Sequence, residues 1–346
     1  MTVNSSALWE RLQFQKPQIS LARPTELRMW LVSLCAFMAV FQSSLSDSFS
    51  SLVAALAAVA AAVLTEFLIL RERKKISALM DGSAVASALI LTLLLPNRIS
   101  PVYAAAGAVF AIAVIKHSFG GLGSNWLNPA AGGWLFVRFS WPSFFHRSLD
   151  ASPLSLVSDA SGFSAAAAEM ASSLDGALRS FLNGTVFSLT GSELPVGYID
   201  LFASPFPGII ADRAVFALLL GTVIISATRL NRSWVPAVFL AVFCFLVRFV
   251  GALPYGGELW NGDLLFALCS GGTLCAAFFL AADPATGAKS NGGMILAAAT
   301  GGAIAFVFRY YGGEAYGAVF AVLAINAMLP IIRVFESRRL YEKRYT

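Results

Sequence analysis

The chain has 346 residues, of which 58% are hydrophobic and only 12% charged, and its mean hydropathy is +0.73. These values exclude an ordinary soluble globular protein, and apolar runs of about 20 residues, enough to cross a hydrocarbon core ~30 Å thick, recur along the chain. The net charge of +5 comes from basic clusters in short loops and at the C-terminus, a pattern typical of the cytoplasmic loops of membrane proteins. We therefore expect the lipid bilayer, and no nucleic acid, to meet that charge.

The chain opens with a polar segment that contains Arg11, Lys16 and Arg23. We interpret 1–26 as a cytoplasmic segment and not as a cleavable signal peptide, because it has no apolar stretch. The first predicted transmembrane half, 27–144, contains five hydrophobic segments. They lie at about 27–46, 50–71, 82–96, 101–117 and 129–144. The third and fifth are short for full spans, so we expect partial or tilted helices there.

A long polar segment, 145–206, separates this half from a second one, 207–334. It contains six acidic residues against two arginines, which is typical of an extracytoplasmic loop. The second half again has five hydrophobic segments, and a basic tail at 335–346 is predicted to be cytoplasmic, like the N-terminus. The five segments lie at about 207–228, 234–253, 263–281, 292–310 and 315–334.

The two halves resemble each other in the order of their helix-breaking residues. Pro96 precedes a helix that ends at the glycine pair 120–121, and Pro284 precedes one that ends at the pair 312–313. Because each half has an odd number of segments, the halves insert in opposite orientations. The sequence therefore predicts an all-α polytopic membrane protein with about ten transmembrane helices in two inverted five-helix halves that contain broken helices.

Two regions are too rich in glycine to continue a regular helix. The first is 120–130 (GGLGSNWLNPA), and the second comprises 270–273 (SGGT) and 282–293. In a membrane such breaks are tolerated where they are buried in protein or line a cavity, and they often bind ions or cofactors. Alternative interpretations are a turn at Asp283 and close helix packing at 270–273. The candidate binding residues are Gly121, Gly123, Asn125, Asn128, Ser270, Thr273 and Asp283.

Several ionisable residues lie within or near the apolar segments and are candidates for functional groups. Most lie close to a segment end, where a side chain can extend to water. Arg138 and Arg248 lie deeper, so we expect them to be paired. His117 has no neighbouring histidine, cysteine or carboxylate along the sequence, so no metal site is predicted there. The set is Glu66, Asp81, Lys116, His117, Arg138, Arg248, Asp263 and Arg309.

Three motifs resemble those of a known family. The stretch 120–130 resembles the GGLGxNxFNPA signature of the RnfD family, which forms one subunit of the Rnf electron-transport complex, and it is similar to the homologous B subunit of the sodium-pumping NADH:quinone reductase. The stretch 270–286 (SGGTLCAAFFLAADPAT) resembles the family's SGATMLGAFFxxTDPVT, and 83–96 (SAVASALILTLLLP) resembles its SALLTGLLLAxxLP helix. The resemblance covers about 25–335 of the chain.

The resemblance implies a multi-pass subunit of the bacterial cell (inner) membrane with both termini in the cytoplasm. Such a subunit carries electrons through bound flavin and couples their transfer to Na⁺ or H⁺ movement. The implied partners are the other Rnf-complex membrane subunits and a flavin-carrying extracytoplasmic subunit. The protein would thus be a component of a translocase and not a stand-alone enzyme, and its sequence contains no nucleotide-binding glycine loop, nucleophile elbow or zinc motif.

Family members carry FMN attached through a phosphoester to a threonine in the extracytoplasmic loop, in a motif close to D-G-x-S-G-A-T. No SGAT occurs within 145–206. The resemblance leaves two alternative attachment residues for FMN. One is Thr185, which precedes 200–202 (DLF) by 15 residues, and the other is Ser164 in 159–164 (DASGFS). The third alternative is that no flavin is covalently attached, with riboflavin or another flavin bound noncovalently.

The family's G-x-x-G-E-T-S element is also replaced, by 207–214 (PGIIADRA). Arg213 in this stretch is a candidate phosphate contact, because a guanidinium binds phosphate in a planar, bidentate way. Two other functions stay open. One is a flavin-depleted scaffold subunit of such a complex, suggested by the missing SGAT. The other is a channel or transporter on the same helical architecture.

Overall fold

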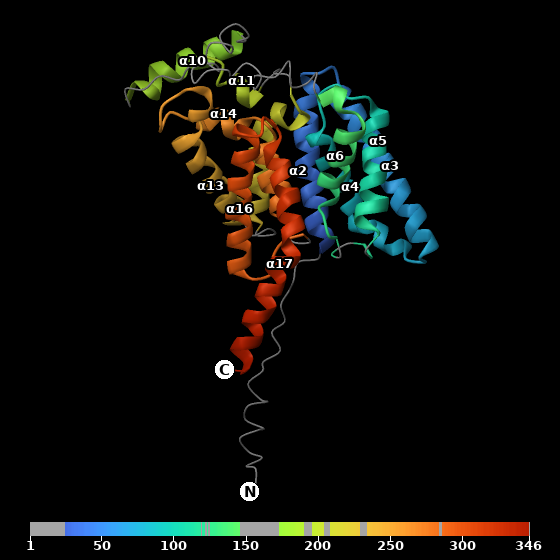
Figure 1. The fold of residues 1–346 in the computed structure, drawn as a ribbon. Helices are drawn as coiled ribbons and strands as arrows, with labels where there is room; N and C mark the ends of the chain where they lie inside the picture. The colour runs from blue at the N-terminus through green and yellow to red at the C-terminus, as the bar shows by residue number, and fades with distance from the viewer. Residues whose placement is uncertain are drawn as a thin grey trace, which may run out of the picture.

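In the computed structural model, the described part of the chain is helical and contains no β-strand (Figure 1). An isolated bridge joins Pro96 to Ile209, and the amide of Ile210 donates to the carbonyl oxygen of Leu95 at 3.0 Å. This short backbone link ties the third segment of the first half to the start of the second half. The described residues are 25–118, 120–121, 123, 125–145, 173–189, 196–203, 208–228, 234–283 and 286–345.

The first half consists of five apolar helical segments that match the predicted ones. Pro101 begins the fourth segment at a position where its missing N–H costs no hydrogen bond. The third and fifth segments are short, as expected. The segments are α2 (Thr25–Leu45), α3 (Ser50–Glu72), α4 (Ser83–Leu94) after the 3₁₀ turn η1 (Ile76–Asp81), α5 (Pro101–Phe110) with the π-helix η2 (Ala111–Lys116), and α6 (Pro129–Ser140).

The second half repeats this order, and its third segment is broken. Gly271 and Gly272 both have φ of 66°, a left-handed conformation that ends α14 at little steric cost. The elements are η4 (Ile210–Arg213), α12 (Val215–Ala227), α13 (Trp234–Val250), η5 (Leu253–Tyr255), α14 (Leu264–Cys269), α15 (Thr273–Cys275), the π-helix η6 (Ala276–Ala281), α16 (Asn291–Tyr310) and α17 (Gly317–Tyr345). The last helix continues to Tyr345, through the segment predicted as a tail.

The long polar segment is partly helical where it is described. It contains α10 (Ser173–Thr185), η3 (Phe187–Leu189) and α11 (Asp200–Ala203). Helices α10 and α11 lie at the top of the bundle in Figure 1, at the end opposite the start of α2 and the end of α17.

Several helices are long and apolar enough to cross a membrane. Within the described residues they number five, and three shorter apolar helices accompany them. Large apolar side chains such as Leu56, Phe216 and Val223 are more than half exposed, which fits contact with lipid tails. The chain is an all-helical polytopic membrane protein. The five helices are Thr25–Leu45, Ser50–Glu72, Trp234–Tyr255, Asn291–Tyr310 and Gly317–Val334.

The packing of the helices shows the inverted repeat directly. In each half the second segment packs on the fourth (α3 on α5, α13 on α16), and the fourth packs on the fifth (α5 on α6, α16 on α17). The first segments, α2 and α12, are antiparallel. Gln42, near the end of α2, accepts a hydrogen bond from the amide of Ala217, near the start of α12. Cys35, earlier in α2, donates to the carbonyl oxygen of Gly221, later in α12.

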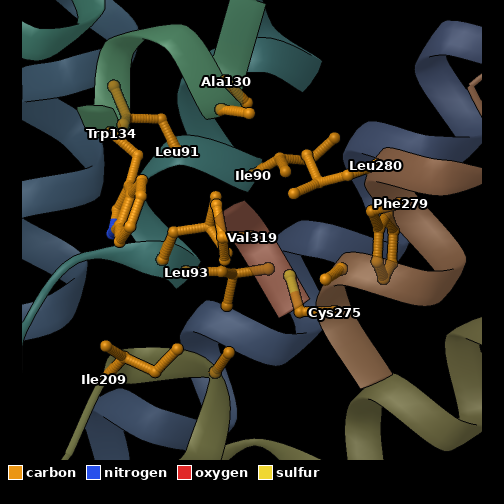
Figure 2. Close-up of a cluster of buried hydrophobic side chains, with 14 of the residues drawn as sticks. Ile90, Leu91, Leu93, Ala130, Trp134, Ile209, Cys275, Phe279, Leu280 and Val319 are labelled. Atoms are coloured by element: carbon orange, nitrogen blue, oxygen red, sulfur yellow. The ribbon is translucent and has the colours of Figure 1, made fainter. Parts of the chain in front are cut away.

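The core lies where the two halves meet (Figure 2). Leu91 and Leu93 of α4 and Trp134 of α6 come from the first half, and Cys275 and Val319 come from the second. All five side chains are fully buried. Apolar contact between the halves therefore holds the breaks of both halves in one rigid frame.

Helices α13 and α16 approach each other too closely to admit a side chain at Gly302. An added Cβ would lie 2.4 Å from the carbonyl oxygen of Phe239 and 3.1 Å from the amide nitrogen of Phe243. We predict that Gly302→Ala lowers the free energy of unfolding by about 1–3 kcal/mol, because the helices must separate. Thermal unfolding in detergent measures this. Gly292→Ala in the same helix is the control, since an added Cβ there meets nothing within 4 Å. Equal unfolding midpoints for the two variants would contradict the prediction.

Candidate functional site

The first break ends at Asn128, which caps α6. Its Oδ1 accepts hydrogen bonds from the amides of Ala130 (3.0 Å) and Ala131 (3.3 Å), and Pro129 occupies the first helical position. Its Nδ2 donates to Oδ2 of Asp283 at 3.2 Å. Asp283 follows the broken third segment of the second half, so this bond joins two stretches that were predicted separately.

The backbone before Asn128 uses glycine where an L side chain would be strained. Gly121 has φ of 105° and Gly123 has φ of 90°. Asn125 follows them and is 6% exposed, yet its Oδ1 accepts no hydrogen bond from the described residues. A buried amide oxygen without a donor indicates a place for water or a ligand.

Asn125 lines a small cavity of about 60 Å³. A buried water needs roughly 10–15 Å³ of such volume, so this cavity has room for a few waters and not for a cofactor. Its lining is mixed, with polar groups from both halves. They are Arg28, Ser83, Ser87, Lys116, Asn125, Asn128 and Asp283.

A larger cavity of about 420 Å³ adjoins it and shares Arg28 and Asp283 with it. This volume is in the range of small-molecule sites. Asn326 of α17 lies among its apolar walls, and its Nδ2 donates to no described residue although the side chain is 4% exposed. The apolar lining includes Leu280, Met294, Val322, Ile325 and Leu329.

The polar lining of the large cavity is held in place by α17. Glu336 accepts hydrogen bonds from the hydroxyl (2.6 Å) and amide (2.9 Å) of Ser290, and Arg333 donates to the carbonyl oxygen of Gly287. Burial acts to raise the pKa of Glu336, but the bonds from Ser290 and Lys289 outweigh it and keep the pKa below its usual value. The stretch 287–290, part of which lines the cavity, is thereby fixed against the last helix.

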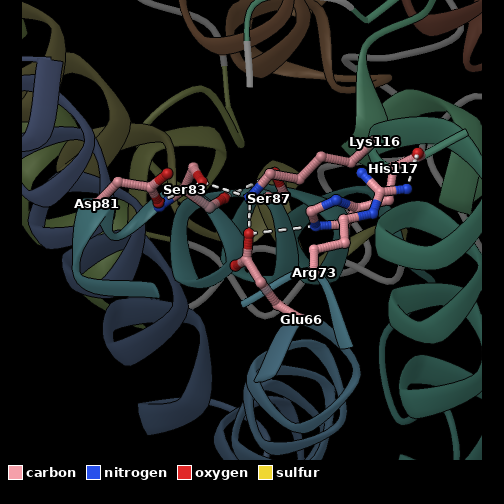
Figure 3. Close-up of polar contacts among 7 residues, drawn as sticks. All are labelled: Glu66, Arg73, Asp81, Ser83, Ser87, Lys116 and His117. Carbon is pink, nitrogen blue, oxygen red and sulfur yellow. Dashed lines mark hydrogen bonds and ion pairs between the residues drawn. The ribbon is translucent and has the colours of Figure 1, made fainter. Parts of the chain in front are cut away.

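A second polar cluster lies where the ends of α3 and η2 meet the start of α4 (Figure 3). The ammonium of Lys116 donates to Glu66 and to the hydroxyl of Ser83, which in turn donates to Asp81. His117 Nε2 lies 3.4 Å from Glu66 Oε1. Arg73 donates to the carbonyl oxygen of His117 at 3.0 Å.

One expectation about this cluster was wrong, and a second held only for neighbours along the sequence. Lys116 and Glu66 do not extend to water: they are 1% and 2% exposed, because each finds its counter-charge inside the bundle. His117 does have a carboxylate neighbour, since the packing of α3 on η2 brings Glu66 to it from 51 residues away. Sequence distance conceals both contacts.

At the second break, Ser270 and Thr273 surround Arg309 of α16. The guanidinium donates to the carbonyl oxygens of Ala267 (2.7 Å) and Ser270 (2.9 Å), and to the hydroxyls of Ser270 (2.6 Å) and Thr273 (3.0 Å). Asp212 accepts from the amide of Gly272 at 2.7 Å. Ser270 and Thr273 thus lie apart from the two cavities, which other predicted residues line.

Of the two deeper arginines, Arg138 has a carboxylate partner, whereas Arg248 bonds a backbone carbonyl oxygen. Arg138 lies 3.3 Å from Oε1 of Glu314, and Arg248 donates to the carbonyl oxygen of Gly262 at 3.2 Å. Arg213 donates to the carbonyl oxygen of Ser46 at 3.2 Å, near the start of α12.

The structure describes one of the two predicted flavin acceptors of the polar segment. Thr185, at the end of α10, is exposed, and its hydroxyl donates to the carbonyl oxygen of Phe181 at 2.7 Å. Ser164 lies outside the described residues. The segment is anchored beside α14 by Tyr198, whose hydroxyl donates to Asp263. Burial, then that bond to the carboxylate, raises the pKa of Tyr198.

Several polar cavity residues were not predicted from the sequence, among them Ser83, Arg28 and Asn326. Arg28 lies close to the N-terminal end of the first segment, where a basic residue is ordinary. Asn326 could have been chosen as a candidate from the sequence, because it is an amide within a run of apolar residues in a membrane segment. Only the packing of α17 on η6 shows that its side chain faces a cavity.

A family model and several individual proteins match the chain, and they all belong to one family. The model of the NQR2, RnfD, RnfE family matches residues 13–342. The chain is 30% identical to the D subunit of the ion-translocating oxidoreductase complex of Vibrio cholerae serotype O1, over 94% of this chain and 97% of the relative. It is 30% identical to the D subunit of the proton-translocating ferredoxin:NAD(+) oxidoreductase complex of Clostridium ljungdahlii, over 89% and 88%. It is 28% identical to the D subunit of the Na(+)-translocating ferredoxin:NAD(+) oxidoreductase complex of Acetobacterium woodii, over 82% of this chain and 80% of the relative.

The buried pair of Glu66 and Lys116 allows a test of the cluster. We predict that Lys116→Met destabilises the protein by about 3–5 kcal/mol, because it leaves a buried carboxylate without its counter-charge. The double variant Glu66→Leu, Lys116→Met should recover much of that loss. Chemical unfolding in detergent measures both.

The control is Glu72→Gln, an exposed carboxylate on the same helix as Glu66. A Lys116→Met variant as stable as this control would show that the ion pair is not formed.

Proposed function

The chain belongs to the NQR2, RnfD, RnfE family, and we propose that it is a membrane subunit of an Rnf-type ion-translocating oxidoreductase complex. In this proposal it carries electrons through bound flavin and couples their transfer to Na⁺ or H⁺ movement. The names of its relatives include both a proton-translocating and a Na(+)-translocating complex, so they support either ion. Its partners are the other membrane subunits and a flavin-carrying extracytoplasmic subunit.

The observation that carries the flavin proposal is the large cavity. A flavin ring is flat and apolar along one edge and has carbonyl oxygens and ring nitrogens along the other. The apolar walls suit the first, and the Nδ2 of Asn326, which has no partner among the described residues, suits an acceptor on the second. Arg28 and Lys289 in the lining suit a phosphate, if the bound form carries one. The residues present therefore fit a noncovalent flavin.

The protein's contribution is position and environment. A bound flavin supplies one- and two-electron redox chemistry. Asn326 orients the ligand, the walls from α16 and α17 exclude water, and the Asn128–Asp283 bond keeps the two halves in register beside it. These groups act as binding and orienting groups and not as acids or bases.

The charge distribution supports an orientation in the bacterial cell membrane. The basic stretch 71–75, Lys289 and Arg333 all lie at the end of the bundle that holds the cavities and the start of α2. Under the positive-inside rule this end faces the cytoplasm, which places α10 outside. Both termini are then cytoplasmic.

Thr185 is the proposed attachment residue for a second, covalent FMN. The residue is exposed on the outer end of the protein, where a flavin transferase can reach it. Helix α10 lies at the end of the bundle opposite the start of α2 (Figure 1). A flavin on Thr185 and one in the large cavity would therefore give electrons a route across the membrane.

We predict that Asn326→Leu lowers the noncovalent flavin content of purified protein, because it removes an amide donor among apolar walls. A loss of about tenfold in affinity corresponds to about 1.4 kcal/mol, the scale of one hydrogen bond. Flavin released by denaturation is measured by fluorescence. Met328→Leu, an exposed position two residues further along α17, is the control. Wild-type protein without releasable flavin would contradict the cavity assignment.

The covalent flavin is tested by in-gel fluorescence of denatured protein made in a host with a flavin transferase. We predict that Thr185→Ala abolishes the signal, whereas Ser164→Ala and Ser188→Ala keep it. Ser188 is an exposed hydroxyl three residues from Thr185 and is the matched control. Loss of the signal only in Ser164→Ala would move the attachment to that residue. A wild-type protein without signal would favour the scaffold alternative for this segment.

A further inference from the structure

Each half has a buried basic residue at an equivalent position, and the two residues have different hydrogen-bond partners. In each half a basic residue near the end of the fourth segment bonds a hydroxyl of the third: Lys116 with Ser83, and Arg309 with Ser270 and Thr273. The hydrogen-bond acceptors of Arg309 among the described residues are carbonyl and hydroxyl oxygens, which do not titrate. Lys116 instead meets the carboxylate of Glu66. The base of the first half therefore bonds a carboxylate directly, whereas the base of the second half bonds neutral oxygens, with the Asp212 carboxylate nearby.

A hydrogen-bonded chain leads from the end of the bundle to Lys116 (Figure 3). Asp81 is partly exposed, Ser83 is buried, and Lys116 is fully buried. Lys116 donates to Ser83, and Ser83 donates to Asp81. A serine hydroxyl both donates and accepts, so it can pass a proton in either direction.

The small cavity continues this chain toward the large one. Ser83 and Lys116 line it, and it shares Arg28 and Asp283 with the large cavity. Its volume of about 60 Å³ suits a few waters, each held by two to four polar partners. The Oδ1 of Asn125, which accepts from no described residue, is one such partner.

We propose that Ser83 and Lys116 form a proton-delivery path from Asp81 through waters of the small cavity to the ligand of the large cavity. The inference rests on the proposed function, because the flavin is the proton acceptor. Electrons reach the flavin from a one-electron carrier of a neighbouring subunit. Each proton taken up by the flavin is replaced along the path from the cytoplasmic end.

The proton steps balance within the chain. The ammonium of Lys116 first gives a proton to water in the small cavity. Ser83 then gives its own proton to the resulting amine as its Oγ takes up the proton that has bound the Asp81 carboxylate. Every side chain returns to its starting state, and one proton has moved. The charged and titratable groups that face Lys116 are Glu66, His117 and Asp81, with Arg28 and Asp283 across the small cavity.

The experiment uses the full chain purified with its flavin. Reduced methyl viologen, a one-electron donor that releases no proton, is mixed with the protein in a stopped-flow instrument. Flavin absorbance reports electron arrival, and a pH-indicator dye in weak buffer reports proton uptake. Flavin content and the unfolding midpoint are measured on the same samples.

We expect Ser83→Ala to slow proton uptake at least about tenfold, as removal of a positioned proton donor does. Ser83→Thr keeps the hydroxyl and restores the rate. Thr92→Val is the control, because Thr92 is a buried hydroxyl on the same helix that donates to the carbonyl oxygen of Ala88 and lines neither cavity. In Ser83→Ala, flavin content stays close to wild type, and any fall in the unfolding midpoint is compared with that of Thr92→Val.

Wild-type proton uptake in Ser83→Ala, with flavin bound, would overturn the path and leave the proposed function intact. An equal slowing in Thr92→Val would also overturn it, since the effect would then come from disturbed packing of α4. Wild-type protein that binds no flavin would contradict the proposed function and this inference together. These outcomes are distinguishable on one set of samples.

Discussion

A helix that breaks inside an apolar bundle frees backbone groups that lipid cannot satisfy, and this constraint organises the protein. At each break, side chains of the break itself or of distant segments satisfy the freed groups. Asn128 caps α6 and bonds Asp283, while Arg309 gathers the carbonyl oxygens at the end of α14 and Asp212 accepts from Gly272. The breaks are therefore rigid, and they can position a ligand.

The two breaks lie at different positions of the repeat, one between the fourth and fifth segments and the other within the third, and their surroundings differ. At the end that bears α10, Arg309 fills the space around the break with hydrogen bonds to neutral groups. At the end that holds the start of α2, the break leaves two adjoining cavities beside a buried Lys116–Glu66 pair. A repeat that is symmetric in its helices is thus asymmetric in its chemistry, and the two cavities lie on one side.

Much of this could be predicted from the sequence, because a membrane limits the choices. Apolar runs located the helical segments, and the glycines at 120–123 and 271–272 located both breaks. What could not be predicted depends on contacts between distant segments. Glu66 and Lys116 are ordinary end-of-helix charges until α3 packs on η2, and Asn326 points into a cavity only because α17 packs on η6. Hydropathy alone cannot say which face of an all-apolar helix meets protein and which meets lipid.

The central claim is that the contact of the first break with the end of the second half's third segment, at Asn128 and Asp283, lies beside a cofactor cavity. A cryo-EM map of the purified protein, at a resolution that shows side chains, tests it most directly. The account predicts a flat density between α16, α17 and η6 in contact with the amide of Asn326, and Asn128 bonded to Asp283 beside it. A cavity closed by its own side chains, or filled only by a lipid chain, would contradict the account.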